Sequence, residues 1–284
     1  MRSLRHDAAV REPFFNVPLV VVASIAVLAG LHAIRVWGDD LPVLRGLGLG
    51  PEDIIYQLAF IPARFALLLG ADPVPALAHR LSADPGNVDL IQRLGIAREI
   101  VADGSSKPWT LVTYALLHGS WAHLILNSVW LLAFGTAVAR RFGTARFVLF
   151  LVVTAIGGAL GHLATHTADV APMVGASASI SGCMAAAMRF VFQPGAPLGA
   201  FRLPEEMSYR LPALPLSRVL SDSRAVTFLV VWFVLNLATG LGADGLGFTD
   251  AAIAWEAHVG GFLVGLLAFR FFDPPYRDSF ADDL

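Results

Sequence analysis

The chain has 284 residues, of which 56% are hydrophobic and 15% charged, with a net charge of −2 and a mean hydropathy of +0.65. Soluble domains carry about 25% charged residues, so this composition excludes a disordered tail and an ordinary cytosolic enzyme, and the lack of a basic surface excludes a nucleic-acid-binding protein. The single cysteine, Cys183, excludes a disulfide framework and a cysteine-based zinc site. A polytopic membrane protein remains.

The first apolar segment is predicted to be an uncleaved membrane-spanning helix. It covers about Phe15–Trp37, and roughly 20 apolar residues in a helix cross the hydrocarbon core of a bilayer. A signal peptide is the competing interpretation, because Arg2, Arg5 and Arg11 precede the segment. However, the segment is longer than the apolar region of a signal peptide, and five more apolar segments follow it.

The next segment, residues 38–120, is predicted to be a long loop on the outer side of the membrane. It contains seven prolines. Within it, Ile54–Leu69 is apolar but is interrupted by Gln57, Pro62 and Arg64. We therefore expect this stretch to lie at the membrane interface rather than to span the bilayer.

Five further spans complete a predicted all-α bundle of six transmembrane helices. They are expected at about Trp121–Arg140, Phe147–His166, Val174–Phe192, Ala225–Leu241 and Ala251–Phe272. Lipid offers no hydrogen bonds to an exposed backbone, so segments at this depth must be helical. Residues 193–224, which contain five prolines and mixed charges, are predicted to be a cytoplasmic loop. The predicted organisation is a short tail (1–14), a membrane domain (15–272) and a second tail (273–284).

The distribution of lysine and arginine predicts that both termini face the cytoplasm, where loops carry an excess of basic residues. With the N-terminus inside, 13 of the 20 basic residues lie on the inner side, and the short outer loops near 166–173 and 242–250 hold none. The other seven lie between Arg35 and Lys107, in or beside the long loop, which counts weakly in this rule. Arginine far outnumbers lysine, and a bacterial inner membrane is the expected location.

Polar side chains inside a membrane span are energetically costly, and a charge at the centre of the span costs about 2.5–3.5 kcal/mol. Such side chains therefore mark candidate sites. In the second span, His123 and Asn127 are four residues apart and share one helix face. Both donate hydrogen bonds without an obligatory charge, which suits an oxyanion, although a pair that bridges two helices has the same pattern. His118 lies near the interface and is expected to be a structural hydrogen-bonding residue.

The fourth span carries three serines within residues 175–182. Close packing of small residues against another helix is one interpretation. The other is a serine nucleophile at a helix N-terminus, where backbone N–H groups face incoming negative charge. Ser177 is the best candidate because it comes first, Ser181 shares its face one turn later, and Ser179 points elsewhere.

The sixth span contains His258, followed by Gly261 and Gly265 at a spacing that permits close helix approach. A single histidine here is usually a hydrogen-bonded core residue, but beside Ser177 it would be the base that accepts the serine proton. His162 and His166, four residues apart at the end of the third span, are compatible with a metal but more typical of a solvated helix end. No phosphate-binding or dinucleotide-binding motif is present in the sequence.

These three clusters, in this order, resemble the rhomboid family of intramembrane serine proteases. The motifs are HGSWAHLILN (118–127), GASASISG (175–182) and AHVGG (257–261), and GTAVARRFG (135–143) is similar to the family's end of the second span. The resemblance covers roughly Trp109–Phe272. It implies a six-helix rhomboid-like bundle.

The resemblance also implies a catalytic Ser–His dyad that needs no aspartate, metal or other cofactor. Ser177 would be the nucleophile, and His258 the general base and later the general acid. The oxyanion hole would consist of His123, Asn127 and the backbone N–H of Ser177. The residues expected to support this site are His118, Ser181, Trp255 and Gly261.

Three residues depart from the family pattern. Ala178 follows the nucleophile, where the family usually has glycine, and its methyl group is expected to tighten contact with a partner helix or to restrict the turn. Ser181 replaces an aromatic residue that commonly stacks on the base, so His258 would need support from Trp255 or Ser181. Ala139 replaces a glutamate near the end of the second span.

The implied function is cleavage of single transmembrane helices of other membrane proteins near the outer face of the bilayer. The substrate would enter past the fifth span and the glycine-rich loop Gly242–Asp250. Two alternatives remain. One is a catalytically inactive rhomboid-like protein that binds membrane proteins without cleaving them. The other is a transporter or channel that uses His123, His258 and Glu256 as a proton relay.

Overall fold

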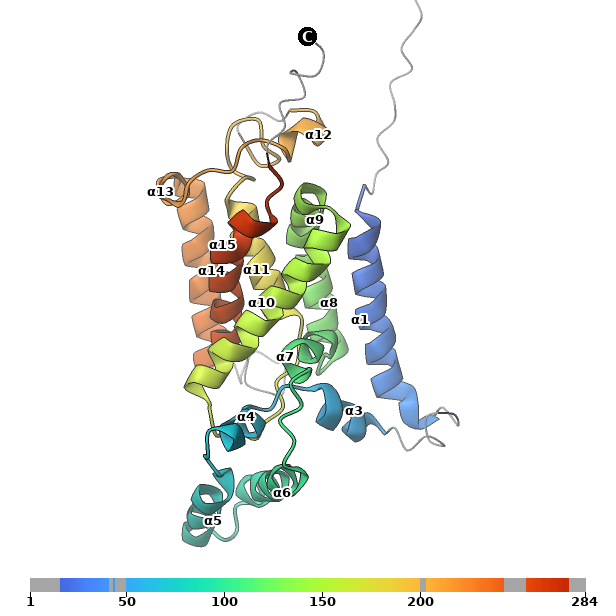
Figure 1. The fold of residues 1–284 in the computed structure, drawn as a ribbon, viewed down its shortest axis with the longest axis vertical. Helices are drawn as coiled ribbons and strands as arrows, with labels where there is room; N and C mark the ends of the chain where they lie inside the picture. Colours follow the sequence, from blue (N-terminus) through green and yellow to red (C-terminus); the bar gives the residue numbers. More distant parts are fainter. Residues whose placement is uncertain (1–15, 41–42, 44–49, 200–202, 243–253, 276–284) are drawn as a thin grey trace, which may run out of the picture.

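The computed structural model describes residues 16–40, 43, 50–199, 203–242 and 254–275. These residues form helices joined by loops, without a β-strand among them (Figure 1). The longer helices are α1 (Leu19–Trp37), α10 (Thr144–Thr165), α11 (Ser177–Met188), α14 (Ser223–Gly242), α15 (Trp255–Phe272) and a continuous run of α8 (Trp121–Trp130), the π-helical turn η3 (Leu131–Gly135) and α9 (Thr136–Phe142). The others are η1 (Gly38–Asp40), α3 (Pro51–Leu58), α4 (Pro62–Leu68), α5 (Pro73–Ala83), α6 (Val88–Asp103), α7 (Thr110–Thr113), η2 (Tyr114–Leu116), α12 (Glu205–Ser208) and α13 (Leu216–Val219). The predicted all-α class is confirmed.

In the described part of the chain, three helical segments are long and apolar enough to cross a bilayer, namely α1, the run Trp121–Phe142 and α10. They correspond to the first three predicted spans. α11 and the Ser223–Ala238 part of α14 are apolar but shorter, and the count of six spans stays a prediction. The predicted tails and the predicted outer loop after α14 lie almost entirely outside the described residues.

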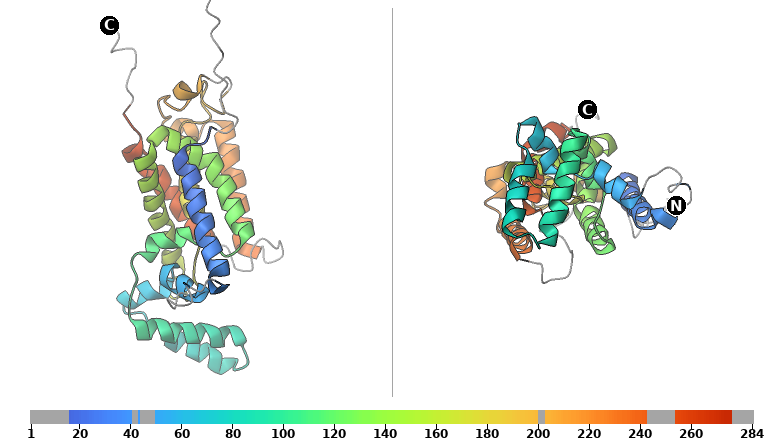
Figure 2. Two further views of the ribbon diagram at one scale, coloured as in Figure 1. Left: turned by 90° about the vertical axis from the view of Figure 1, so that its right-hand side faces the viewer. Right: turned by 90° about the horizontal axis from the view of Figure 1, so that it is seen from below.

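α11 is the central helix of the bundle, because every one of its residues after Ser177 is buried. α15 packs against both α10 and α11, whereas α1 lies at one side of the bundle against α8 and η3 (Figure 2). Glycines allow the tightest of these contacts. A Cβ atom on Gly261 of α15 would lie 2.1 Å from the carbonyl oxygen of Ala178, and one on Gly265 would lie 2.5 Å from the Cα atom of Gly182. The small residues therefore set the distance between α11 and α15.

The long loop between α1 and α8 is folded, and its helices lie at the end of the bundle opposite α12 and α13 (Figure 1). Pro51, Pro62 and Pro73 each occupy the first position of a helix, where the missing N–H group leaves no hydrogen bond unmade. The predicted interfacial segment Ile54–Leu69 is divided between α3 and α4, and the backbone of Phe60 between them pairs with that of Met173. This pairing joins the layer formed by the helices between α1 and α8 to the segment that leads into α11.

A cluster of polar side chains holds the helices of this layer to one another. The guanidinium of Arg64 donates to the Tyr56 carbonyl at 2.6 Å and lies over the Tyr56 ring. The Tyr56 hydroxyl donates to Asp103 at 3.3 Å, and Lys107 lies 3.0 Å from the same carboxylate. The hydrogen bond from Lys107 lowers the pKa of the Asp103 carboxyl group. Tyr56 of α3 is thus linked to α4 through Arg64 and to α6 through Asp103.

At the opposite end, Arg141 joins α9 to the end of α15 and to the loop before α13. Its guanidinium pairs with Asp273 at 2.6 and 2.9 Å and donates to the carbonyls of Tyr209 and Leu211 at 2.9 and 2.8 Å. The Arg141 side chain is only 6% exposed. Exchange to alanine leaves Asp273 and both carbonyls without this partner.

We therefore expect Arg141→Ala to destabilise the fold by about 3 kcal/mol. The measurement is the midpoint of thermal unfolding in detergent. Arg146→Ala, which removes an exposed arginine near the start of α10, serves as the matched control and should leave the midpoint unchanged. Equal midpoints for the two variants would contradict this account of Arg141.

Candidate active site

Ser177 is the first residue of α11, and the loop before it determines its position. Gly175 has a φ of +129°, a conformation that residues with a side chain rarely adopt. Its N–H donates to the carbonyl of Tyr114 at 3.0 Å, and the Tyr114 hydroxyl donates to the carbonyl of Ala155 in α10 at 2.8 Å. The turn that leads to Ser177 is therefore held by a hydrogen bond to η2, which is itself hydrogen-bonded to α10.

His258, in the first turns of α15, lies beside Ser177. Its Nε2 atom is 2.7 Å from the Ser177 Oγ, and its Nδ1 atom contacts the Oδ1 of Asn236 in α14. The Asn236 Nδ2 donates to the carbonyl of Trp232 at 2.8 Å, so the amide oxygen is the atom that faces His258. Since the Asn236 oxygen accepts a hydrogen bond there, Nδ1 carries the hydrogen and Nε2 has the free lone pair.

This arrangement matches what a serine nucleophile requires. A base lies within hydrogen-bond reach of the hydroxyl, and a third group holds the base in the useful tautomer. Three helices supply the three groups: Ser177 begins α11, His258 belongs to α15 and Asn236 to α14. The close packing of α11 against α15 at Gly261 sets the distance between the first two.

His123 and Asn127 project from α8, which begins at a cap where the Ser120 hydroxyl accepts the His123 N–H at 3.2 Å. A Cβ atom on Gly175 would lie 2.8 Å from the His123 Cε1 and 3.7 Å from the Ser177 Oγ, so the imidazole and the hydroxyl border the same glycine. Asn127 is 4% exposed, and its Nδ2 has no hydrogen-bond partner among the described residues. A buried amide donor without a partner is unusual in a folded protein, and it is available to a ligand.

The other predicted site residues have different surroundings. His118 is buried with its ring centroid 5.1 Å from that of His123, and its ring nitrogens have no hydrogen-bond partner in the described part of the chain. The structure therefore gives it ring packing instead of the expected structural hydrogen bond. The Ser181 hydroxyl donates to the Ser177 carbonyl at 2.8 Å, so it supports the first turn of α11. Trp255 begins α15, and Gly261 contacts the backbone of Ala178.

The departures at residues 178 and 139 are accommodated by packing. A Cβ atom on Gly158 of α10 would lie 2.4 Å from the Cβ of Ala178. The glycine in α10 therefore makes room for the methyl group next to Ser177, in agreement with the expected close helix contact. Ala139 is buried in the main hydrophobic core together with residues of α1 and α10.

Asn236 is the site residue that the sequence analysis missed. We expected Trp255 or Ser181 to support His258, but the Nδ1 contact comes from the fifth predicted span. The sequence did mark Asn236, because it is the only residue of α14 with a side-chain amide and polar groups at membrane depth are costly. It went unused because a single asparagine forms no spacing pattern.

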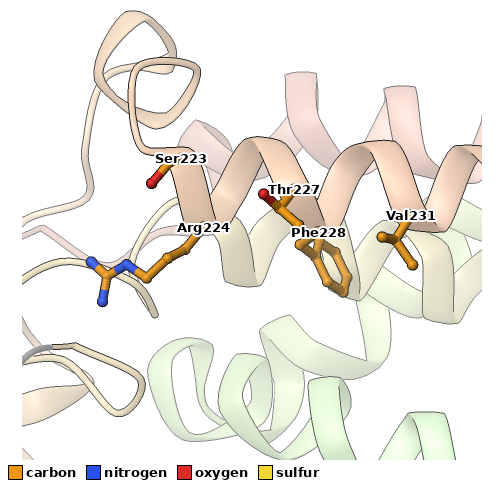
Figure 3. A pocket seen from close by; sticks show the side chains of 5 residues that line it. All are labelled: Ser223, Arg224, Thr227, Phe228 and Val231. Atoms are coloured by element: carbon orange, nitrogen blue, oxygen red, sulfur yellow. The ribbon is translucent and has the colours of Figure 1, made fainter.

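A shallow hollow on α14 lies outside this site. It is lined by Ser223, Arg224, Thr227, Phe228 and Val231, which precede Asn236 along the helix (Figure 3). None of these residues was predicted to act in the site. The one charged residue among these five, Arg224, is engaged with Asp222 at 3.1 Å.

Comparison with known proteins gives a consistent result. A family model described as the Rhomboid domain matches residues 105–273. The chain is 27% identical over 176 residues to Rhomboid protease GluP of Bacillus subtilis, covering 62% of this chain and 28% of GluP. It is 26% identical over 171 residues to RHOMBOID-like protein 5 of Arabidopsis thaliana, covering 60% and 48% of the two chains. It is 27% identical over 159 residues to Rhomboid protease GlpG of Yersinia pestis, covering 56% and 46%. The matched part is less than half the length of each of these relatives.

Proposed function

The chain belongs to the rhomboid family, and we propose that it is an intramembrane serine endopeptidase that cleaves transmembrane helices of other membrane proteins. The observation that carries this proposal is the 2.7 Å contact between the Ser177 Oγ and the His258 Nε2. The contact of His258 Nδ1 with Asn236 supports it, because that contact leaves Nε2 free to accept the serine proton.

In the proposed mechanism, the Ser177 oxygen attacks the carbonyl carbon of the scissile peptide while its proton passes to the His258 Nε2. Negative charge then develops on the carbonyl oxygen, where the Ser177 N–H and the side chains of His123 and Asn127 donate hydrogen bonds. The tetrahedral intermediate collapses, His258 protonates the leaving amine, and an acyl-enzyme remains. Water attacks the acyl group with His258 again as the base, which releases the second product and restores the serine.

The substrate must expose a peptide carbonyl that a helix normally keeps in a hydrogen bond. Glycine or proline in the substrate helix lowers the cost of local unwinding. We therefore propose single-span membrane proteins with such residues near the outer face as substrates. The expected cavity that carries water to Ser177 would be bordered by His123, Asn127, Ser181 and His258.

The membrane arrangement is part of the proposal. Contact with the lipid bilayer follows from the family and from the apolar helices. We propose six spans within a single membrane domain (15–272), with short cytoplasmic tails. The start of α1 and the end of α15 lie at the same end of the bundle, which supports termini on one side (Figure 1). Relatives from Bacillus and Yersinia support a bacterial cell membrane.

Labelling with a fluorophosphonate, which reacts with activated serines, tests the proposal. The full chain in liposomes should be labelled, and Ser177→Ala and His258→Ala should not be. Ser181→Ala is the matched control, because it removes a serine on the same helix face and should retain the label. The family also contains inactive members. A folded parent protein without label would place the chain among those, and label that survives in Ser177→Ala would assign another nucleophile.

A further inference from the structure

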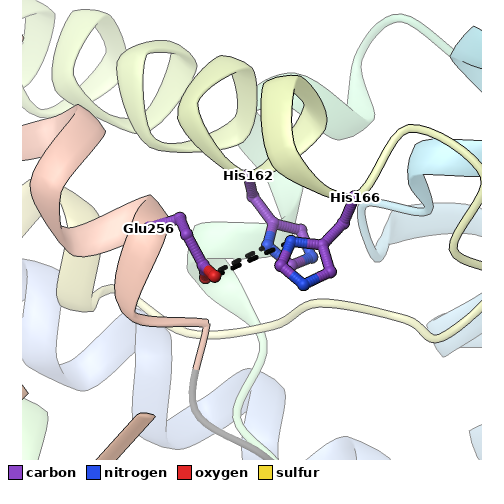
Figure 4. Close-up of side chains that lie close together, drawn as sticks. All are labelled: His162, His166 and Glu256. Atoms are coloured by element: carbon purple, nitrogen blue, oxygen red, sulfur yellow. Dashed lines mark ion pairs between the residues drawn. The ribbon is translucent and has the colours of Figure 1, made fainter. Parts of the chain in front are cut away.

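Three side chains with metal-binding atoms meet where the end of α10 crosses the start of α15 (Figure 4). The Nδ1 atoms of His162 and His166 each lie 3.8 Å from a different carboxylate oxygen of Glu256. One potential ligand atom from each of the three residues lies within 4.8 Å of the others. The sequence showed only the histidine pair, and the tertiary fold adds the carboxylate.

Helix packing holds the cluster together. A Cβ atom on Gly161 would lie 2.9 Å from the carbonyl oxygen of Glu256, so glycine at this position lets α15 approach α10 closely beside the histidines. The two imidazole rings are nearly parallel, with centroids 4.6 Å apart. Their spacing of four residues puts both on one face of the helix end. The fold therefore brings the three side chains together. His162 lies in the last turn of α10, Glu256 in the first turn of α15, and His166 directly after α10, where its Nδ1 also lies 2.9 Å from the Thr165 Oγ1.

One nitrogen of the cluster is buried without a hydrogen-bond partner in the described residues, and one of its side chains is exposed to solvent. The side chains of His162 and Glu256 are 8% and 13% exposed, and that of His166 is 40% exposed. Among the described residues the buried Nδ1 of His162 has no hydrogen-bond partner, although it faces the carboxylate. His166 also lines a hollow that contains Arg93 and Asp169. Those two residues pair with each other at 2.7 Å, so neither the cation nor its partner is committed to the cluster.

We propose that His162, His166 and Glu256 form a binding site for a divalent transition-metal ion, with Zn²⁺ as the best-fitting ion. Two imidazoles and one carboxylate are a ligand set that zinc takes readily, with a fourth position left to water. Bonds of about 2.1 Å at tetrahedral angles require ligand atoms about 3.4 Å apart. The histidine–carboxylate separations are 3.8 Å and all three ligand atoms lie within 4.8 Å of one another, so side-chain shifts of about 1 Å would bring them to this spacing.

Bound metal would clamp the end of α10 to the first turn of α15. Glu256 lies two residues before His258, so the ion would fix the helix segment that carries the proposed base. The site is separate from the Ser177–His258 pair and takes no part in its chemistry. Its existence can be tested in a protein that has no proteolytic activity.

The experiment uses the full chain without an affinity tag, carrying Ser177→Ala, in detergent. Titration with Zn²⁺ should show one site, and Co²⁺ should give the visible absorption of a four-coordinate ion. His166→Ala and Glu256→Gln should each weaken Zn²⁺ binding about tenfold or more. His79→Ala removes an exposed histidine of α5 and should leave the affinity unchanged.

Thermal unfolding distinguishes loss of the site from loss of the fold. Without metal, His166→Ala should unfold at the same temperature as its parent, because this side chain is partly exposed at a helix end. Zn²⁺ should then raise the unfolding temperature of the parent and of His79→Ala but not of His166→Ala. Absence of binding, or equal binding by all four proteins, would overturn the proposed site.

Discussion

Replacing Gly261 with alanine is expected to destabilise the fold by about 3 kcal/mol and to slow labelling of Ser177 about 100-fold. The added Cβ would lie 2.1 Å from the carbonyl oxygen and 2.7 Å from the carbonyl carbon of Ala178. Both are backbone atoms, so no change of side-chain rotamer relieves the collision and α11 must move away from α15. Because Ala178 follows Ser177, that movement also lengthens the distance from Ser177 to His258.

Gly30→Ala is the matched control for this experiment. Gly30 lies on α1, and nothing lies within 4 Å of the position that its Cβ would take. The same change of residue type should therefore leave both the unfolding midpoint and the labelling rate unchanged, apart from a small gain in helix propensity. If Gly261→Ala behaved like Gly30→Ala, the contact between α11 and α15 would not determine the geometry of the site.

Removal of either side-chain donor on α8 should strongly lower the rate of cleavage while Ser177 and His258 stay in place. We expect His123→Ala and Asn127→Ala each to lower kcat by about 10²–10³ with little change in KM, since these hydrogen bonds form to the oxyanion rather than to the ground-state substrate. Asn127 already has an unpartnered amide donor in the described structure. Its loss should therefore cost little stability, and the effect on kcat is then attributable to the transition state.

The measurement is cleavage of a single-span membrane protein in liposomes, with the unfolding midpoint recorded for every variant. Ser128→Ala provides the control on the same helix, because it removes only the hydrogen bond from the Ser128 hydroxyl to the Leu124 carbonyl at 2.8 Å. A decrease in kcat of the same size for Ser128→Ala would show that α8 is perturbed generally. Unchanged kcat for Asn127→Ala would exclude that residue from the oxyanion hole.

The sequence was most informative where polar residues interrupt apolar helices. Ser177, His258, His123 and Asn127 were identified in this way, and the structure places the first three close together. The start of α11 at Ser177 rather than near Val174 depends on the backbone of Gly175, whose φ of +129° lies outside the helical region. Residue spacing does not reveal such a turn in an apolar segment.

Contacts between segments that are far apart in the chain could not be predicted from the sequence. Asn236 meets His258 only because α14 lies beside α15, and Glu256 meets His162 only because Gly161 permits a close helix crossing. Neither contact has a local sequence pattern. The helices of the layer between α1 and α8 were likewise unforeseen, although the prolines that suggested a loop mark the start of three of them.

The position of Asn236 has a consequence for the timing of the proposed proteolysis. α14 exposes a row of apolar side chains, with Val230, Val231 and Val234 each more than half exposed, whereas α11 and α15 are joined through glycines. Any sideways movement of α14 carries Asn236 away and removes the acceptor that selects the tautomer of His258. If the chain is the proposed protease, His258 would then be an effective general base only while α14 packs against the bundle. Movement of α14 away from the bundle and proton abstraction from Ser177 would thus occur one after the other, not at the same time.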